Sequence, residues 1–198
     1  MSNHYDFIEI GTSDFDTFIQ DEKMKDLKGL SIEPVKYYLD KLPERKNIIK
    51  INAGISDLSG TCDVYYVPED KFKQYGLEGW AKGCNSINKY HPTVENWLIS
   101  QKYDLKEAFC KNTVPVYTLK EIIEMYKITS IDILKIDTEG HDTIILNHYF
   151  NNCNILAKEI QFETNSLSTV SEIENVIYKA FLLGYKLEKL EGDCILKR

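Results

Sequence analysis

Short apolar runs alternate with amphipathic stretches along most of this chain, and that alternation restricts the fold more than any other feature. The runs at 7–10, 30–33 and 131–137 are the clearest, and each is followed by a turn or by apolar residues at helical spacing. Strands that alternate with helices form βαβ units, in which the strands lie parallel. We therefore predict an α/β fold with a doubly wound, mostly parallel sheet of about seven strands and an antiparallel C-terminal hairpin.

The remaining elements follow from the same periodicity. Helices are predicted after Pro34, after the turn at 138–140, and at 15–26, 93–109, 119–126 and 171–183. Further strands are predicted at 47–52 and 157–163, with an exposed strand at 61–67, a short edge segment at 114–117, and the hairpin at 185–187 and 194–196. Thr118 and Glu121 match a capping box at the start of one helix, and Gly184 is placed to end another.

Residues 68–92 interrupt the periodicity with glycines and prolines. A stretch of that length is too long for a plain connection, which favours a functional loop or lid. Trp80 and Tyr90 within it are suited either to stacking on a ring of a ligand or to anchoring the loop on the core. Because the chain has no internal repeat and no linker composition, we expect residues 1–198 to form a single domain that carries this lid.

The composition argues against several classes of protein. The chain has 24 basic and 31 acidic side chains, a net charge of −7 and no basic stretch, which argues against nucleic-acid binding. No apolar run approaches the roughly 20 residues that span a bilayer, and no secretory signal pattern opens the chain. Five widely spaced cysteines without a C-x-x-C pair argue against disulfides and against a cysteine-based zinc site. We expect a cytoplasmic protein without a membrane partner, acting on a small molecule.

Every predicted parallel strand ends in small, polar or acidic residues. Ligands bind at the carboxyl ends of the strands in open α/β sheets, so these residues are expected to face one site. In strand order they are Gly11-Thr12-Ser13-Asp14, Glu33, Gly54-Ile55-Ser56-Asp57, Asp137-Thr138-Glu139-Gly140 and Glu163-Thr164-Asn165. A purely structural sheet would not need such residues at five strand ends.

Glu33 closes the second predicted strand, 22 residues after Gly11. An acid at about that interval can accept hydrogen bonds from both ribose hydroxyls of an adenosine. The alternative is that Glu33 caps the helix that starts at Pro34. Both interpretations remain open from the sequence.

The sequence of the turn after the first strand distinguishes between two candidate ligands that contain adenosine. A dinucleotide site requires G-x-G-x-x-G, and here those positions hold Gly11, Ser13 and Asp16. Asp14 and Asp16 would repel a pyrophosphate. S-adenosylmethionine has no phosphate and carries a cationic ammonium and sulfonium, so an acidic turn favours it over NAD.

Several blocks of this chain resemble the FkbM-type methyltransferase family. They are 7–11 (FIEIG), 31–34 (SIEP), 52–56 (NAGIS) with Gly60, 114–116 (VPV) with Thr118 and Leu119, and above all 134–142 (LKIDTEGHD). The last block is the most specific, because members of the family typically read L-K-I-D-x-E-G there. The resemblance covers about residues 6–165 and implies a Rossmann-like class I methyltransferase fold with S-adenosylmethionine-dependent O-methylation, often of sugars or natural products.

The resemblance also assigns roles by position. Glu9, Gly11, Thr12, Ser13 and Asp14 would hold the methionine part of the cofactor. Glu33, with Pro34 beside it, would hold the ribose, and Ile55, Ser56 and Asp57 would flank the adenine. Asp137 would lie beside the methyl group. The chain departs from the family at Phe15, where the first motif usually has a second glycine, so the turn would follow a different path or the methionine pocket would be narrower.

Catalysis of methyl transfer to a hydroxyl requires alignment of the acceptor and a base for its proton. Asp137, Glu139 and His141 are the candidate bases, although His141 could equally be exposed and Glu139 could cap the following helix. Asp137, Glu163 and Asn165 offer oxygen ligands that suit Mg²⁺, with ordinary strand-end hydrogen bonding as the simpler explanation.

Three functions compete at this stage. The first is a methyltransferase acting on a small-molecule hydroxyl, for example of a saccharide. The second is a catalytically silent relative that serves as a cofactor-binding or interaction module, which Phe15 and the short chain favour. The third is an enzyme that uses NAD or a nucleotide sugar, which the acidic first turn disfavours.

Overall fold

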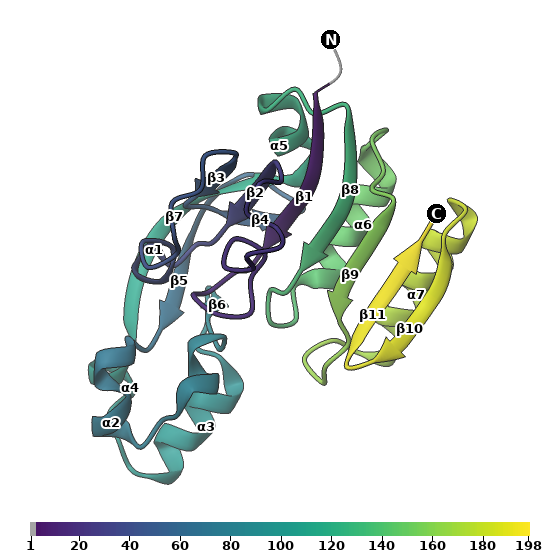
Figure 1. Ribbon diagram of the computed structural model, residues 1–198. Helices are drawn as coiled ribbons and strands as arrows, with labels where there is room; N and C mark the ends of the chain where they lie inside the picture. Colours follow the sequence, from purple (N-terminus) through teal and green to yellow (C-terminus); the bar gives the residue numbers. More distant parts are fainter. Residues whose placement is uncertain (1–2) are drawn as a thin grey trace.

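The computed structural model describes residues 3–198, apart from the side chain of Glu191, and contains two sheets that lie side by side (Figure 1). The larger sheet has seven strands in the order β10-β11-β9-β8-β1-β2-β3. Their bounds are β1 His4–Ile10, β2 Gly29–Ile32, β3 Ile48–Ile51, β8 Ser130–Ile136, β9 Glu159–Glu163, β10 Lys186–Glu191 and β11 Asp193–Lys197. The first five of these pair in parallel and the last two are antiparallel, so the predicted fold class and hairpin are confirmed.

Three helices cover one face of the larger sheet: α5 Leu119–Met125, α6 Asp142–Asn152 and α7 Val170–Leu182 (Figure 1). Their apolar residues join those of the central strands in one buried cluster, which includes Ile8, Leu134 and Tyr149. The capping box of Thr118 and Glu121 is present, and a second one starts α7. Gly184, in a left-handed conformation with φ +89°, follows α7 as predicted.

Residues 11–28 and α1 (Lys36–Leu39) cover part of the opposite face, where Phe7, Ile19 and Leu39 are buried together. The helix predicted at 15–26 is wrong, because this segment is a series of turns. Ser13 and Asp16 have φ values of +46° and +50°, and left-handed residues cannot continue an α-helix. The helix predicted after Pro34 is reduced to the four residues of α1. Its predicted apolar face is nevertheless buried, and consists of Val35, Tyr38, Leu39 and Leu42.

The smaller sheet has the order β4-β7-β5-β6, with bounds β4 Gly54–Ser56, β5 Gly60–Tyr66, β6 Ser86–Ile87 and β7 Cys110–Thr118. The strand predicted at 61–67 exists as β5 but is not exposed, because Val64 and Tyr66 pack with Tyr38 of α1. The edge segment predicted at 114–117 is also wrong, since it belongs to the nine-residue β7 between β4 and β5. Pro115 is tolerated there because pairing with β4 begins only at Val116.

Residues 69–109, here called the insert, contain the short strand β6 and several short helices that extend beyond the smaller sheet (Figure 1). The helices are η1 Glu69–Lys71, α2 Phe72–Tyr75, η2 Gly79–Lys82, α3 Pro92–Ser100 and α4 Leu105–Ala108. A separate apolar cluster that includes Phe72, Leu98 and Phe109 holds them together. The single helix predicted at 93–109 is wrong, because the chain turns after α3 through left-handed Lys102.

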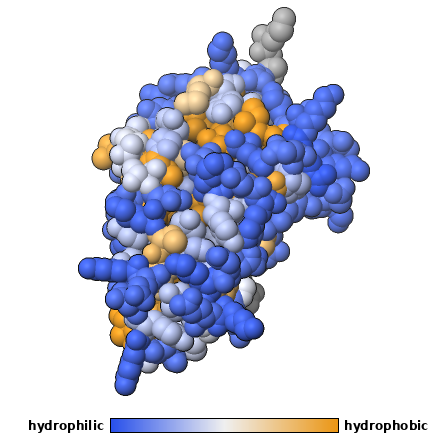
Figure 2. Space-filling view, turned by 90° about the vertical axis from the view of Figure 1, so that its left-hand side faces the viewer, coloured by the Kyte–Doolittle hydropathy of each residue, from blue (hydrophilic) through white to orange (hydrophobic). Residues whose placement is uncertain are grey.

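The surface on the side of α1 and β7 is largely hydrophilic, with several hydrophobic side chains gathered in its upper part (Figure 2). This matches a chain in which 28% of the residues are charged. Within residues 3–198, no helix combines the length and the apolar character needed to cross a membrane.

Candidate active site

A cavity of about 360 Å³ lies at the carboxyl ends of β1, β2 and β8. The order of the strands reverses here, because the chain builds the sheet outward from β1 in one direction and from β8 in the other. Both the position and the volume are typical of small-molecule sites. Ten of the predicted site residues line the cavity: Gly11, Thr12, Ser13, Glu33, Pro34, Ile55, Asp137, Glu139, His141 and Glu163.

Gly11 lets the backbones that follow β1 and β8 approach each other. Its φ is +80°, and a Cβ atom at this position would lie 1.8 Å from the carbonyl oxygen of Asp137. No side chain fits such a gap. Glycine is therefore required by both conformation and space, and the close approach brings the turn after β1 beside Asp137.

Glu33 follows β2 and has only 2% of its surface exposed. Its Oε2 accepts a hydrogen bond from the backbone N–H of Ser13 at 2.7 Å, and its Oε1 accepts one from Val35 at 2.8 Å. Burial raises the pKa of Glu33 to about 7, against the opposing effect of these two hydrogen bonds. A carboxylate has about four lone-pair sites, so two remain for a ligand. The structure thus accommodates both interpretations of this acid.

Glu9 is fully buried and does not line the cavity. It accepts hydrogen bonds from the hydroxyl of Thr17 at 2.6 Å and the backbone N–H of Phe18 at 2.9 Å. Nζ of Lys135 lies 3.0 Å from the other carboxylate oxygen. Glu9 therefore positions the turn after β1, and Lys135, which sequence reasoning missed, is the residue that reaches the cavity.

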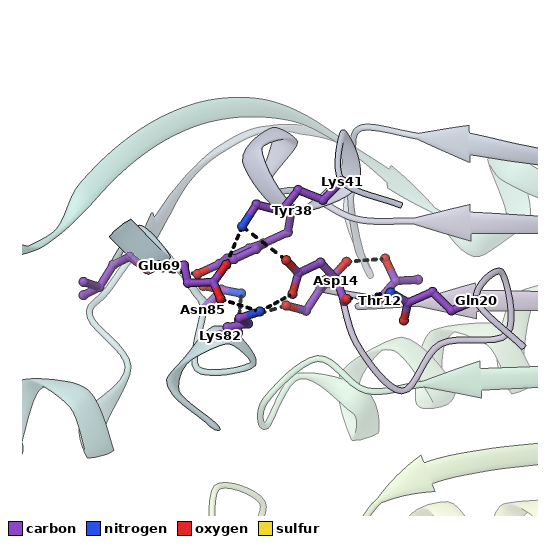
Figure 3. Close-up of polar contacts among 10 residues, drawn as sticks. Thr12, Asp14, Gln20, Tyr38, Lys41, Glu69, Lys82 and Asn85 are labelled. Carbon is purple, nitrogen blue, oxygen red and sulfur yellow. Dashed lines mark hydrogen bonds and ion pairs between the residues drawn. The ribbon is translucent and has the colours of Figure 1, made fainter. Parts of the chain in front are cut away.

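Asp14 points away from the cavity and lies between two lysines (Figure 3). Its carboxylate oxygens are 3.4 Å from Nζ of Lys41 and 3.3 Å from Nζ of Lys82, and both lysines also pair with Glu69. The negative charge of Asp14 is thus compensated. Its network instead joins the turn after β1 to the insert, which supplies Glu69 and Lys82.

Ser56, Asp57 and His141 form a hydrogen-bonded chain of which only His141 lines the cavity. Oγ of Ser56 donates to Oδ1 of Asp57 at 3.0 Å and lies 2.9 Å from Nε2 of His141. Because a hydroxyl has one proton, Oγ must accept from Nε2–H, which leaves the lone pair on Nδ1. Burial lowers the pKa of His141, so the ring is neutral at neutral pH. Within residues 3–198, Nδ1 has no hydrogen-bond partner.

Asp137, Glu139 and Glu163 each have a carboxylate oxygen within 4.8 Å of the others. Burial raises the pKa of Asp137 to about 6 and that of Glu163 to about 7, and neighbouring acids contribute to both shifts. Asn165, the other predicted metal ligand, donates to Glu163 at 2.6 Å and accepts from the N–H of Leu167 at 2.9 Å. Its amide therefore serves strand-end hydrogen bonding, and we assign no metal to this acidic group.

The insert contributes a wall of the cavity, and the residues that form it lie within the stretch 68–92 where a functional loop or lid was predicted. Its lining residues are Trp80, Gly83, Asn85, Ser86, Ile87 and Lys89. Trp80 is the lining residue that the sequence singled out within this stretch. Tyr90, the other aromatic candidate, instead stacks on Phe109 with ring centroids 4.2 Å apart, inside the apolar cluster of the insert. Loop residues without periodicity carry no sequence signal for which of them reach a cavity.

The strand order, the glycine turn after β1 and the buried acid after β2 define a Rossmann-like α/β protein with a ligand cavity at its switch point. The model of the methyltransferase FkbM domain matches residues 9–187, so the chain belongs to the FkbM methyltransferase family. The resemblance inferred from the sequence is thereby confirmed, and with it the assignment to a family of methyltransferase enzymes.

One solved structure supports the fold. The crystal structure of methyltransferase FkbM from Methylobacillus flagellatus KT superimposes with a TM-score of 0.52 at 12% sequence identity. The match covers 100% of this chain and 44% of that protein, so the chain spans less than half of its length. Among curated protein sequences, none matches this chain.

Proposed function

We propose that this chain is an S-adenosylmethionine-dependent methyltransferase that methylates a hydroxyl of a small molecule such as a saccharide. The observation that carries the proposal is the position of Glu33. Its buried carboxylate reaches the cavity at the end of β2, next to the turn that Gly11 allows, and it retains free lone pairs. That is the place where an acid binds the ribose of an adenosine in this class of fold.

The charge of the cavity also fits a cationic cofactor. Five acids line it, namely Asp16, Glu33, Asp137, Glu139 and Glu163, against two lysines, Lys89 and Lys135. Ile10 and Ile55 add apolar surface suited to an adenine. Asp14, the acid that the sequence suggested for this role, has its charge compensated by two lysines. That role falls instead to the acids that follow β8 and end β9, which face the cavity.

Bound S-adenosylmethionine supplies an electrophilic methyl group on a sulfonium. The protein must then orient the acceptor hydroxyl and remove its proton. We propose that Nδ1 of His141 accepts the proton of the acceptor hydroxyl, because its lone pair is free and the ring lines the cavity. Ser56 and Asp57 hold the ring through Nε2–H and stabilise the imidazolium that forms. Asp137 and Glu139 contribute negative charge beside the reacting groups.

A calorimetric titration with S-adenosylmethionine and S-adenosylhomocysteine tests the proposal. We expect micromolar binding of both, abolished by Glu33→Ala. Binding of NAD without binding of either methyl-donor species would overturn it. Turnover is then measured as S-adenosylhomocysteine released in the presence of a saccharide library.

Phe15 favours a second candidate, a cofactor-binding module without turnover. It occupies the motif position that usually holds a second glycine, and it lines the cavity against Gly83 of the insert. Cofactor binding with no product from any acceptor would support this candidate. Product from any acceptor would exclude it.

A further inference from the structure

Cys84, His91 and Glu139 form a cluster in the wall of the cavity. One ring nitrogen of His91, Sγ of Cys84 and a carboxylate oxygen of Glu139 all lie within 4.8 Å of one another. Cys84 and His91 belong to the insert, 2 and 9 residues after η2. Glu139 follows β8 in a left-handed conformation with φ +52°. Residues 48 positions apart thus meet at the junction between the insert and the larger sheet.

Contacts within the protein do not satisfy this cluster. Nε2 of His91 lies 3.2 Å from a carboxylate oxygen of Glu139, which accounts for one ring nitrogen. The other nitrogen, Nδ1, is buried without any hydrogen-bond partner among the described residues, although His91 has only 2% of its surface exposed. Cys84 is 9% exposed, and its thiol has a single long contact, 3.9 Å to the carbonyl oxygen of Trp80. Nε2 of His91, the carboxylate of Glu139 and a thiol without a close partner among the described residues are therefore the atoms available to a ligand.

The donor set selects the metal. Thiolate sulfur, imidazole nitrogen and carboxylate oxygen are the three ligand types of Zn²⁺, whereas Mg²⁺ and Ca²⁺ prefer oxygen alone. Ligand atoms around a tetrahedral zinc lie about 3–4 Å from one another, which small side-chain adjustments can reach from the present spacing. We propose that Cys84, His91 and Glu139 bind one Zn²⁺ ion, with the fourth position facing the cavity that Glu139 lines.

Such a site goes beyond the proposed methyl transfer. The ion would connect the insert to the turn after β8 and hold this wall of the cavity in place. On binding, the Cys84 thiol releases its proton to solvent and its sulfur forms the bond to zinc. The wide spacing of the cysteines argued against a zinc site built from several neighbouring cysteines. It does not test a site with a single cysteine ligand. A site with one cysteine requires the fold to bring its partners together.

Cobalt titration of the metal-free chain, residues 1–198, tests the site, because Co²⁺ replaces Zn²⁺ and reports a thiolate ligand through a sulfur-to-cobalt charge-transfer band. We expect one equivalent of Co²⁺ to produce the band and Zn²⁺ to displace it. Cys84→Ser should remove the band, while Cys153→Ser, a matched change at a distant free cysteine, should retain it. Glu139→Gln should weaken metal affinity at least about 10-fold, as even changes around a metal ligand do.

Three results would overturn the site: no charge-transfer band in the unaltered chain, the same band in Cys84→Ser, or binding abolished by Asp137→Asn but not by Cys84→Ser. The last would place the ion on the acidic group instead. Circular dichroism checks that each variant is folded, and if Cys84→Ser is not, His91→Gln replaces it with the same expectation of weakened binding. The titration needs no S-adenosylmethionine, so its failure and the failure of the proposed function are distinguishable.

Discussion

The backbone N–H of Ser13 donates a 2.7 Å hydrogen bond to Oε2 of Glu33, which joins the turn after β1 to the end of β2. Ser13 has a φ of +46°, a conformation that costs free energy for a residue with a side chain. The bond to a buried carboxylate compensates part of that cost. The shape of the cavity therefore depends on an acid that is also placed to bind the ligand.

Glu33→Gln should destabilise the protein and weaken cofactor binding. Two backbone N–H groups point at the carboxylate, and the single amide oxygen of glutamine can accept from only one of them. An unpaired buried N–H costs about 1–3 kcal/mol, measurable as a lower free energy of unfolding in urea. We also expect at least about 10-fold weaker binding of S-adenosylmethionine, since 1.4 kcal/mol corresponds to a factor of ten. Glu124→Gln on the exposed face of α5 is the control, and unchanged stability of Glu33→Gln would contradict the assigned contacts.

Gly11→Ala should disrupt the cavity because its Cβ would overlap the carbonyl oxygen of Asp137. The ends of β1 and β8 would have to separate, and a loss of about 1–3 kcal/mol in stability is expected from overpacking alone. Gly79→Ala provides a matched control, since a Cβ there meets no atom within 4 Å. Calorimetry should show lost cofactor binding for the first variant and unchanged binding for the second. Equal behaviour of the two would show that the close approach is unimportant.

His141→Ala should lower kcat by about 10²–10⁴-fold if the ring removes the hydroxyl proton. Ser56→Ala should lower kcat by a smaller factor and leave KM unchanged, because Ser56 positions the ring without touching the acceptor. Ser59→Ala is the control, because Ser59 lies three residues after Ser56 but is hydrogen-bonded to Glu121. Steady-state kinetics on the best acceptor measures all three. A change in KM alone for Ser56→Ala would assign that residue to binding.

Stability should fall as the pH rises from about 5 to about 8. Burial raises the pKa of Glu33 from 4.5 to about 7 and that of Asp142 from 3.8 to about 7, with nearby Asp137 and, for Glu33, Asp14 adding to the shift. Each group binds its proton more tightly in the folded state, so its contribution is fully present below the unfolded pKa and is lost as pH rises through 7.

Thermal unfolding followed by circular dichroism at several pH values measures this effect. Glu33→Gln should reduce the dependence of Tm on pH, whatever its effect on Tm itself, because glutamine does not titrate. Glu124→Gln should keep the dependence of the unaltered chain. A Tm that rises steadily over this pH range would contradict the burial of these acids in the folded state.

The elements that could be predicted are those whose signal is local. Ile131 and Leu134 belong to an apolar run too short for a helix, and they lie in the central strand β8. The same reasoning failed for the turn segment after β1, where it predicted a helix at 15–26. Its acidic and apolar residues have helical spacing, but bonds from Thr17 and Phe18 to buried Glu9 hold it in another path. Those hydrogen bonds join the turn to the strand β1, and they cannot be predicted from the periodicity of hydrophobic residues.

Sequence alone determined the sheet, its hairpin and the residues at the strand ends, because burial of alternating apolar runs leaves few arrangements and the carboxyl ends of parallel strands converge. Tertiary structure decided which of those residues face the cavity. It paired Asp14 with Lys82, Ser56 with His141 and Glu139 with His91, across 68, 85 and 48 positions. Two of these pairs depend on how the insert packs against the larger sheet and the third on how β4 packs beside the turn that follows β8, and the short-range pattern of the chain does not encode that packing.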